Sequence, residues 1–320
     1  MAPVPSDGAV PGGAVPGGAP SGGAVSGGVI PEGVIQDSGV PPDGGVPDGA
    51  TRLLGIVGDP IAQVRSPPLW GALFRYNKVN AVCVPFHVRA DGLARFLAGF
   101  RTAENVIGLL VTVPHKIAAA KLAGGLTERA RKVGTANILR PLPDGRWEGD
   151  TLDGLGFVRA LKAEGHTVEG RRALVVGAGG VGSAIAFALA EAGVARVALA
   201  DIDTERARAL SQRIMVLTGV ASAVVPATGA GFDLIVNASP LGMRDGDAMP
   251  VDLTGVTPEA IVGDVVIRRT LTPVLRAARE IGCAVREGAA MTDHQVAAMA
   301  DFLGLAGGDW SVAAIRTAMG

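Results

Sequence analysis

The chain has 320 residues, with 29 Lys or Arg and 30 Asp or Glu, which gives a formal net charge of −1. This balance offers no electrostatic reason to expect nucleic acid or a membrane as a partner. Gly, Pro and charged residues interrupt every apolar stretch, so no transmembrane helix is predicted. The length is sufficient for two domains. Cys83 and Cys283 lie far apart in unlike contexts, and the four histidines form no zinc-ligand pattern. We therefore expect reduced thiols, no metal and a cytoplasmic location.

The first 50 residues differ in composition from the rest of the chain. They contain fourteen Gly and nine Pro and neither Lys nor Arg. Such a segment cannot bury enough apolar surface to offset the entropy lost on ordering. We predict a disordered Gly/Pro-rich tail over 1–50. It does not resemble a secretory signal, because it lacks a basic start and a continuous apolar core.

From residue 52 onward, apolar runs alternate with helical patterns, which is typical of an α/β fold. The run 106–113 is apolar throughout, as expected for a strand buried on both faces. The pattern predicts strands over 53–57, 82–86, 106–113, 134–139 and 147–150, and helices over 69–76, 93–103, 116–122 and 127–132. We assign 51–152 to a first α/β domain.

The stretch 173–201 carries the clearest pattern in the chain. An apolar run over 173–176 leads into G-x-G-x-x-G at Gly177, Gly179 and Gly182, and a small-residue helical pattern follows. A second apolar run ends at Asp201, 19 residues after the last of these glycines. Strand, glycine turn, helix, strand and acid together are typical of a dinucleotide-binding unit, whose helix N-terminus faces the phosphates. We predict a Rossmann domain over 153–285 and C-terminal helices over 286–320.

The acid at the end of the second strand bears on the choice of dinucleotide. A carboxylate at Asp201 can bind a ribose 2′-hydroxyl and would repel a 2′-phosphate, which favours NAD over NADP. Arg206 and Arg208 lie one helical turn further on and keep NADP open. Their simpler interpretation is a solvated helix face, which we expect for both.

Polar residues follow the apolar runs of the first domain, where α/β sheets place their sites. Lys116 and Asp153 would suit the oxidation of an alcohol, because a lysine beside a carboxylate can take the proton that leaves oxygen as hydride leaves carbon. Simpler roles remain open from the residues alone. Lys116 could be an exposed lysine at a helix start, and Asp153 a helix N-cap. Thr112, Asn137 and Gln295 could likewise be ordinary strand-end or capping groups.

Seven short motifs occur in order along the chain and cover roughly residues 53–304. By these motifs the sequence resembles the shikimate and quinate dehydrogenase family. The family patterns are G-x-P-x-x-x-S-x-S-P, matched in part at 58–67, N-V-T-x-P-x-K at 110–116, G-A-V-N-T at 134–138, N-T-D-G-x-G at 151–156, V-N-A-T-P-x-G-M at 236–243, D-V-V-Y-x-P-x-x-T-P at 264–273 and G-x-x-M-x-x-x-Q at 288–295.

The resemblance implies a fold and a set of site residues. The fold is an α/β substrate-binding domain and a Rossmann domain, with C-terminal helices that return to the first domain and a cleft between the two. Lys116 and Asp153 would be catalytic. The other implied roles are substrate binding by Ser66, Thr112, Asn137 and Gln295, pyrophosphate binding by Gly177, Gly179, Gly180 and Gly182, ribose binding by Asp201, and contact with the nicotinamide half by Ser239, Val265 and Gly288.

Several positions depart from the family pattern. Val64 and Ile267 stand where the family has a serine and a tyrosine that sit toward the substrate carboxylate, and Leu110 and Leu152 replace an asparagine and a threonine. Burying a carboxylate without donors costs several kcal/mol. Either an arginine supplies the missing contact or the substrate differs. The candidate arginines are Arg65, Arg268 and Arg269. The N-R-T sequence of NADP-dependent members is also absent.

We therefore expect a dehydrogenase that uses NAD, or less readily NADP, on a secondary ring alcohol of a shikimate- or quinate-like compound or on the matching ketone. One alternative is an ordinary NADP-dependent shikimate dehydrogenase of chorismate and aromatic amino acid biosynthesis. Another is a nucleotide-sensing protein of the same fold without turnover. The expected partner is a small-molecule substrate, with neither nucleic acid nor membrane, and a homodimer is possible.

Overall fold

The computed structural model describes residues 47–268 and 270–320. The predicted tail over 1–50 lies outside the described residues except for 47–50, which are exposed and precede the first strand. Arg269 is also outside them. Among the helices that the structure describes, none is long and apolar enough to cross a membrane.

The first sheet has six strands in the order β2-β1-β3-β5-β6-β4. β1 pairs in parallel with β2 and with β3, whereas β5 runs antiparallel to β3 and β6. The strands are β1 (Arg52–Gly58), β2 (Ala81–His87), β3 (Val106–Val111), β4 (Gly125–Leu126), β5 (Ile138–Pro141) and β6 (Trp147–Asp150). Five of the six residues of β3 are buried, as its continuous apolar run predicts.

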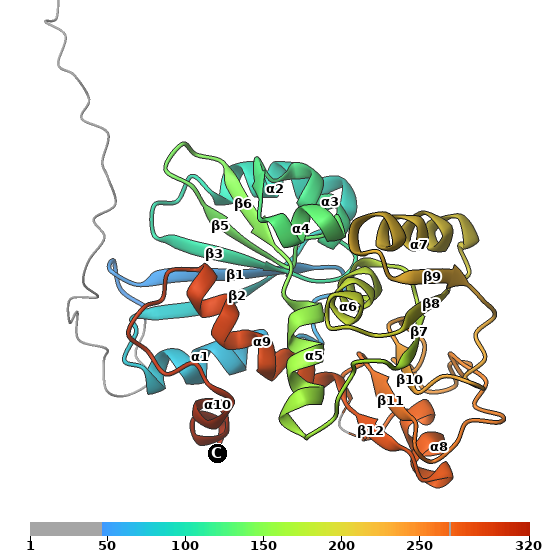
Figure 1. Ribbon diagram of the computed structural model, residues 1–320. Helices are drawn as coiled ribbons and strands as arrows, with labels where there is room; N and C mark the ends of the chain where they lie inside the picture. Colours follow the sequence, from blue (N-terminus) through green and yellow to red (C-terminus); the bar gives the residue numbers. More distant parts are fainter. Residues whose placement is uncertain (1–46, 269) are drawn as a thin grey trace, which may run out of the picture. The chain divides into compact units, whose positions relative to one another are not determined.

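Helices cover both faces of this sheet (Figure 1). One face packs against α1 (Ser66–Tyr76), α9 (Gly288–Phe302) and α10 (Val312–Met319). On that side the Trp70 ring lies 5.6 Å from Phe74 and 5.7 Å from Trp310, between ring centroids. The other face packs against α2 (Leu93–Phe100) and α3 (Lys116–Leu122). The 3-10 turn η1 (Ala90–Gly92) precedes α2, and α4 (Glu128–Val133) precedes β5.

The second sheet is parallel throughout, in the order β12-β11-β10-β7-β8-β9. Its strands are β7 (Arg172–Val176), β8 (Arg196–Ala200), β9 (Ala221–Val224), β10 (Leu234–Asn237), β11 (Ile261–Asp264) and β12 (Ala284–Arg286). Helices α5 (Asp153–Ala163), α6 (Gly180–Glu191) and α7 (Thr204–Thr218) share one apolar core with this sheet, and α8 (Pro273–Ile281) shares another. A parallel sheet with helices on both faces is the Rossmann architecture, so the predicted α/β fold is confirmed.

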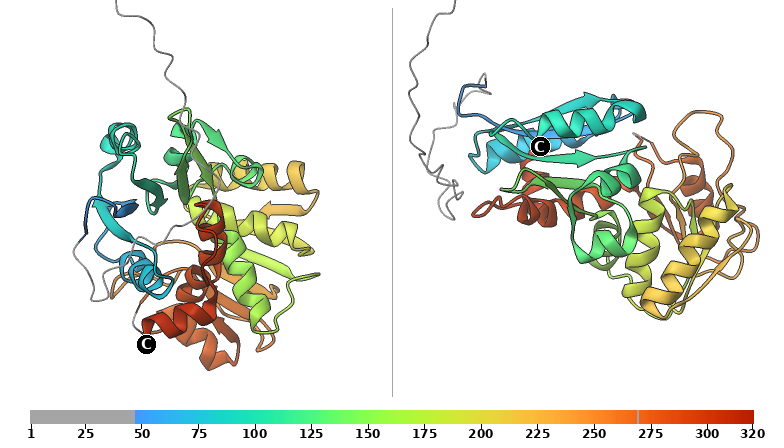
Figure 2. Two further views of the ribbon diagram at one scale, coloured as in Figure 1. Left: turned by 90° about the vertical axis from the view of Figure 1, so that its left-hand side faces the viewer. Right: turned by 90° about the horizontal axis from the view of Figure 1, so that it is seen from above.

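Helix α9, the first of the two C-terminal helices, lies beside α5, as the views in Figures 1 and 2 agree. The approach is close because Gly156 of α5 has no side chain. A Cβ at Gly156 would lie 2.5 Å from the carbonyl oxygen of Met291 and 3.0 Å from Cβ of Gln295. The contact places Gln295 next to the end of the first sheet, where the candidate site residues gather.

Several predicted boundaries in the first domain were wrong. The helix predicted from residue 69 begins at Ser66. The strand predicted over 106–113 ends at Val111, because the backbone turns and His115 N donates to Thr112 O at 2.9 Å. The helix predicted to residue 103 ends at Phe100. The strand predicted over 134–139 begins only at Ile138, because Gly134 ends α4 with a φ of 74°. These shifts leave Thr112 and Asn137 in loops at the sheet edge.

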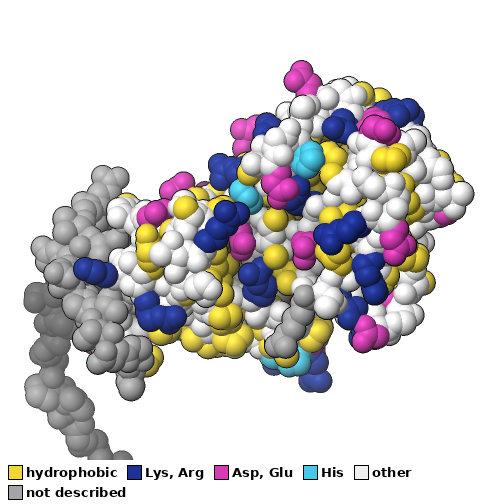
Figure 3. All heavy atoms as spheres, turned by 90° about the horizontal axis from the view of Figure 1, so that it is seen from below, with side chains coloured by type: hydrophobic (Ala, Val, Ile, Leu, Met, Phe, Trp, Pro, Cys, Tyr) yellow, Lys and Arg dark blue, Asp and Glu magenta, His cyan; other side chains and the backbone are white. Residues whose placement is uncertain are grey.

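Acidic and basic side chains are interspersed on the face drawn in Figure 3. The part of that face that the structure describes has no broad area of a single charge. This agrees with the near-zero formal net charge of the sequence. The described part of this face therefore offers no extended patch of one charge for a large charged partner.

Candidate active site

Two charged side chains meet in the interior at the start of α3 and of α5. Lys116 Nζ lies 2.6 Å from Asp153 Oδ2, and the two residues are 9% and 2% exposed. Lys116 follows directly after the turn that ends β3, which aims its side chain inward. The exposed-lysine interpretation of Lys116 is therefore wrong. Asp153 is also no N-cap, because Leu152 holds that position and no side-chain cap bond forms.

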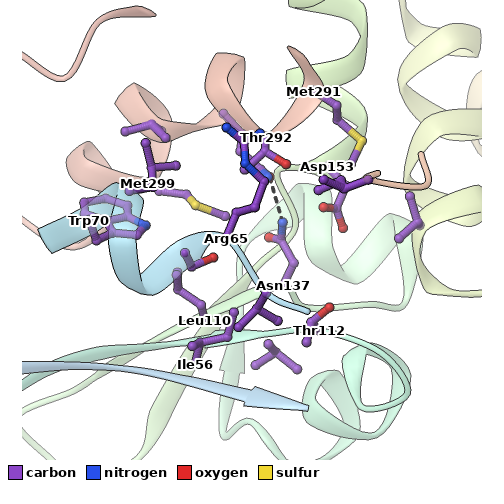
Figure 4. Close-up of a pocket in the computed structure, with 18 of the residues that line it drawn as sticks. Ile56, Arg65, Trp70, Leu110, Thr112, Asn137, Asp153, Met291, Thr292 and Met299 are labelled. Atoms are coloured by element: carbon purple, nitrogen blue, oxygen red, sulfur yellow. Dashed lines mark hydrogen bonds between the residues drawn. The ribbon is translucent and has the colours of Figure 1, made fainter. Parts of the chain in front are cut away.

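A second buried pair lies beside the first. Asn137 Nδ2 donates to Gln295 Oε1 at 2.9 Å, and Asn137 Oδ1 accepts from the Leu152 backbone N–H at 2.9 Å. Figure 4 shows Asn137 with Asp153 and Thr112 around the same space. The Leu152 contact fixes the Asn137 side chain against the residue that precedes Asp153. Gln295 comes from α9, so a helix from the C-terminal part of the chain completes the site.

These residues line a cavity of about 170 Å³. All four predicted substrate residues line it, namely Ser66, Thr112, Asn137 and Gln295, together with Lys116 and Asp153. Much of the remaining wall is apolar. The lining residues that sequence reasoning missed include Trp70 of α1 and Met291, Thr292 and Met299 of α9. Met291 is the methionine of the G-x-x-M-x-x-x-Q motif, which gave it no role. The sequence signal of Trp70 and Met299 was a position on a helix with an apolar face, which does not separate cavity wall from core.

A larger cavity of about 430 Å³ lies between the glycine turn of the Rossmann unit and Lys116. Its lining includes four of the predicted cofactor residues, namely Gly179, Gly180, Ser239 and Val265. The two cavities share Thr112, Lys116 and Val265 among their walls. They therefore adjoin at the lysine, so that a ligand in each would meet there.

The glycine turn is shaped to let a ligand approach its backbone. A Cβ on Gly182 would overlap the carbonyl oxygen of Gly177, so only glycine lets α6 pack this closely. Gly177 has a φ of 102°, a conformation that L side chains rarely adopt. By contrast, a Cβ on Gly179 would meet nothing within 4 Å, and α6 begins at the next residue. Open backbone at a helix N-terminus fits a dinucleotide pyrophosphate.

Asp201 lies beside this turn at the end of β8, where its side chain is 4% exposed. Oδ2 accepts from Ala178 N at 2.5 Å, and Oδ1 accepts from Asp203 N at 2.8 Å and from Arg206 Nη2 at 2.7 Å. Burial raises the pKa of Asp201, but these hydrogen bonds outweigh it and hold the pKa below its ordinary value. A carboxylate with a lowered pKa therefore lies at the end of β8, beside the glycine turn.

The two neighbouring arginines differ in their contacts. Arg206 lies on a solvated helix face, as predicted, with 43% of its side chain exposed, but it also pairs with Asp201 and lines the larger cavity. Arg208 pairs with Glu205 on the exposed side of α7, as predicted. Proximity in sequence did not distinguish them. The difference arises because Arg206, five residues after Asp201, can reach back to the strand end.

A buried hydrogen-bond network holds the end of β11 beside the larger cavity. Asp264 accepts from Asn237 Nδ2 at 2.9 Å, from Val266 N at 3.0 Å and from Thr272 Oγ1 at 2.6 Å. Ser239 Oγ in turn donates to Asn237 Oδ1 at 2.7 Å. Burial raises the pKa of Asp264 to about 6, against the lowering effect of these three donors. The network fixes the loops that carry Ser239 and Val265.

Gly288 fixes the start of α9 in the same region. A Cβ on Gly288 would overlap the carbonyl oxygen of Val265. Because α9 begins at Gly288, the helix starts in direct contact with the residue that lines both cavities. The structure thus brings together the predicted residues Ser239, Val265 and Gly288 at one end of the second sheet.

The arginines proposed to compensate for the lost donors also lie in different places. Arg65 lines the smaller cavity. Arg268 instead pairs with Asp245 at 2.5 Å and donates to Gly242 O at 3.1 Å, and it lines neither cavity. Val64, Leu110 and Ile267 line the smaller cavity. The apolar side chains that replace polar residues of the family pattern are therefore part of the cavity wall.

Comparison with known proteins shows the family to which the chain belongs. The model of the shikimate dehydrogenase substrate binding domain matches residues 56–139, and the ThiF family model matches residues 159–213. Shikimate dehydrogenase (NADP(+)) of Rhodospirillum rubrum is 36% identical over 255 residues, which cover 76% of this chain and 88% of that protein. The chain belongs to the shikimate dehydrogenase family. This places it among the NAD(P)-dependent oxidoreductases that act on CH–OH groups.

Solved structures agree with this membership. Quinate dehydrogenase from Corynebacterium glutamicum in complex with NAD is 32% identical, with a TM-score of 0.73 over 84% of this chain and 98% of that chain. The 5-ketofructose reductase of a Gluconobacter species is 26% identical, with a TM-score of 0.73 and the same coverages. The fold thus serves proteins named for different substrates, and the substrate of this chain must be argued from its own cavity.

Proposed function

We propose that the protein interconverts a secondary ring alcohol of a shikimate- or quinate-like compound and the matching ketone, with NAD in preference to NADP. One observation carries the proposal. The buried Lys116–Asp153 pair stands where two cavities adjoin, one walled by the glycine turn and one by the predicted substrate residues. Proton transfer and hydride transfer in alcohol oxidation need this arrangement.

The chain's own groups supply the proton chemistry. A ring hydroxyl in the smaller cavity would lose its proton to the Lys116–Asp153 pair as the hydrogen on the same carbon leaves with both bonding electrons. A bound nicotinamide supplies the acceptor for that hydride, or its donor in the reverse direction. Because both residues are buried, the proton is held at Nζ or Oδ2 rather than lost to bulk water. Asn137 and Gln295 would orient the neighbouring hydroxyls.

The NAD preference rests on Asp201. Its carboxylate oxygens already accept three hydrogen bonds, yet a carboxylate has about four acceptor sites, which leaves room for a ribose hydroxyl. A 2′-phosphate would instead face a buried negative charge. Arg206 offsets part of that repulsion, so we expect a preference rather than exclusion of NADP.

The proposed division of labour follows the two sheets. We assign 51–152 to substrate binding, 153–285 to NAD(P) binding, and 286–320 to helices that return to the first domain. The sheet boundaries support this division, since β1 to β6 lie within 52–150 and β7 to β12 within 172–286. The packing of α9 and α10 with α1 supports the return of the C-terminus.

Initial rates test the proposal directly. Shikimate and quinate are each offered with NAD and with NADP, and the appearance of reduced nicotinamide is followed by absorbance. We expect turnover of at least one acid and a higher kcat/KM with NAD. Tight binding of NAD without turnover of either acid, in either direction, would contradict the proposal and favour a nucleotide-sensing role.

A further inference from the structure

Among the residues that the structure describes, Arg65 is the one arginine that lines the smaller cavity. It directly precedes α1, next to Val64 and Ser66, which line the same cavity. In Figure 4 its side chain extends toward Thr292, with Trp70 on one side and Asp153 on the other in this view. A guanidinium is thus presented to the space in which the proposed function puts the substrate.

The Arg65 guanidinium is not fully satisfied by protein groups. Its Nη1 atom is buried without a hydrogen-bond partner, although 33% of the whole side chain is exposed. The nearest carboxylate oxygen, Asp293 Oδ1, lies 4.0 Å away and is itself buried without a partner. Charges at this separation attract each other but form no hydrogen bond. A buried donor left unpaired costs free energy, which a ligand acceptor would recover.

The surrounding wall makes the positive charge distinctive. Val64, Leu110 and Ile267 give this part of the cavity alkyl surface, where the family pattern has polar side chains at the same positions. The hydroxyl of Ser66 remains. An acidic group entering beside Arg65 would find its guanidinium and the hydroxyls of Ser66 and Thr292. The alkyl wall would strengthen the resulting ion pair.

We propose that Arg65 determines substrate specificity by binding an acidic group, a carboxylate, on the ring that Lys116 and Asp153 oxidise. The inference rests on the proposed function and adds a residue, Arg65, that would select the acid form of the substrate over a neutral analogue. A planar guanidinium with several donors suits a carboxylate, and it would supply the donors that Val64 and Ile267 lack. Asp293 balances the Arg65 charge while no substrate is bound.

The test compares shikimate with its carboxamide, which keeps shape and hydroxyls but loses the charge. Equilibrium dissociation constants and kcat/KM are measured for both with NAD. The wild-type protein is expected to prefer shikimate by roughly 10- to 100-fold, the range for a hydrogen bond to a charged group. Equal affinity for acid and amide would overturn the inference, and it would point to a neutral ring alcohol as substrate.

Variants locate the preference. Arg65→Gln should raise the KM for shikimate by about 10- to 100-fold and leave the carboxamide within about 3-fold, with kcat for both little changed. Arg65→Lys keeps the charge but loses the planar guanidinium, so its KM for shikimate should lie between those of the wild-type protein and Arg65→Gln. Arg268→Gln is the matched control, because Arg268 lines neither cavity, and it should leave the preference intact. Loss of the preference in the control but not in Arg65→Gln would overturn the assignment.

The same measurements separate this inference from the proposed function. Preferential binding of shikimate without turnover would support Arg65 while contradicting the dehydrogenase activity. Turnover of acid and amide alike would support the activity while overturning Arg65. The wild-type comparison holds even if Arg65→Gln fails to fold, which circular dichroism would reveal.

Discussion

Gly180 lies directly against Lys116, so the glycine turn of the Rossmann unit contacts the proposed catalytic lysine. A Cβ on Gly180 would lie 2.9 Å from Cβ of Lys116, closer than side chains normally approach. Gly180→Ala should therefore displace the lysine stem away from its present position. We expect kcat to fall by about 10-fold or more, since small misplacements of reacting groups are costly.

The measurement is kcat at saturating cofactor, with the melting temperature as a check on folding. Gly99→Ala is the control, because a Cβ at Gly99 in α2 meets nothing within 4 Å. It should leave kcat unchanged and stabilise the helix slightly. An unaltered kcat in Gly180→Ala would mean that the contact does not position Lys116.

Removal of the lysine amine should abolish proton transfer without emptying the cofactor site. Lys116→Ala is expected to lower kcat by about 100- to 10,000-fold, the usual contribution of general acid–base catalysis. The NAD dissociation constant should change little, as Lys116 touches the cofactor turn only through its stem. Lys121→Ala, an exposed lysine on the same helix, is the matched control. Equal activity in both variants would remove Lys116 from the mechanism.

Asp201→Ala should shift the choice of cofactor toward NADP. The change removes the charge that repels a 2′-phosphate and frees Arg206 from its ion pair. We expect the NAD-to-NADP ratio of kcat/KM to fall by about 10-fold or more. In Asp201→Ala/Arg206→Gln the gain with NADP should disappear. A ratio that stays constant in the single variant would mean that another residue sets the preference.

The buried Asp264 should make stability depend on pH. Burial raises its pKa from 3.8 to about 6 in the folded protein. Between these values the folded state holds a proton that the unfolded chain releases, so the free energy of unfolding falls as pH rises through this window. The total change is of the order of 2–3 kcal/mol.

Asp264→Asn should flatten this part of the pH profile, measured by urea unfolding between about pH 4 and pH 6. The amide can still accept from Asn237 and Val266 through its oxygen, so the variant is expected to fold. Asp91→Asn, at an exposed residue of η1, controls for the loss of one carboxylate. A profile that keeps its slope in Asp264→Asn would assign the effect to another group.

The Rossmann unit was predictable from sequence because its signals are local. The strand, the glycine turn and Asp201 follow one another within about 30 residues. Gly177 and Gly182 are required by the backbone conformation and by close packing. Lys116 and Asp153 were harder. The residues alone suggested the pair for alcohol oxidation but left an exposed lysine and a helix N-cap as open alternatives, and the resemblance favoured the pair. Their 2.6 Å contact joins residues from two helices that sequence spacing does not bring together.

The cavity walls could not be predicted from local patterns. Trp70 and Met299 lie on helices at opposite ends of the folded sequence, and only the packing of α9 beside α1 brings them to one cavity. Arg206 shows the same limit on a smaller scale. Its sequence position fits an exposed helix face, but its side chain reaches Asp201. Where a long side chain ends depends on neighbours that periodicity does not specify.

Transfer of the hydrogen itself can be followed with labelled substrate. Shikimate or quinate with deuterium on its CH–OH carbons is incubated with NAD and the protein, and the reduced cofactor is analysed by mass spectrometry. We expect deuterium on the nicotinamide with the wild-type protein, and none in the same time with Lys116→Ala. Bound NAD that stays unreduced and unlabelled with both acids would show that the protein does not transfer hydride from such compounds.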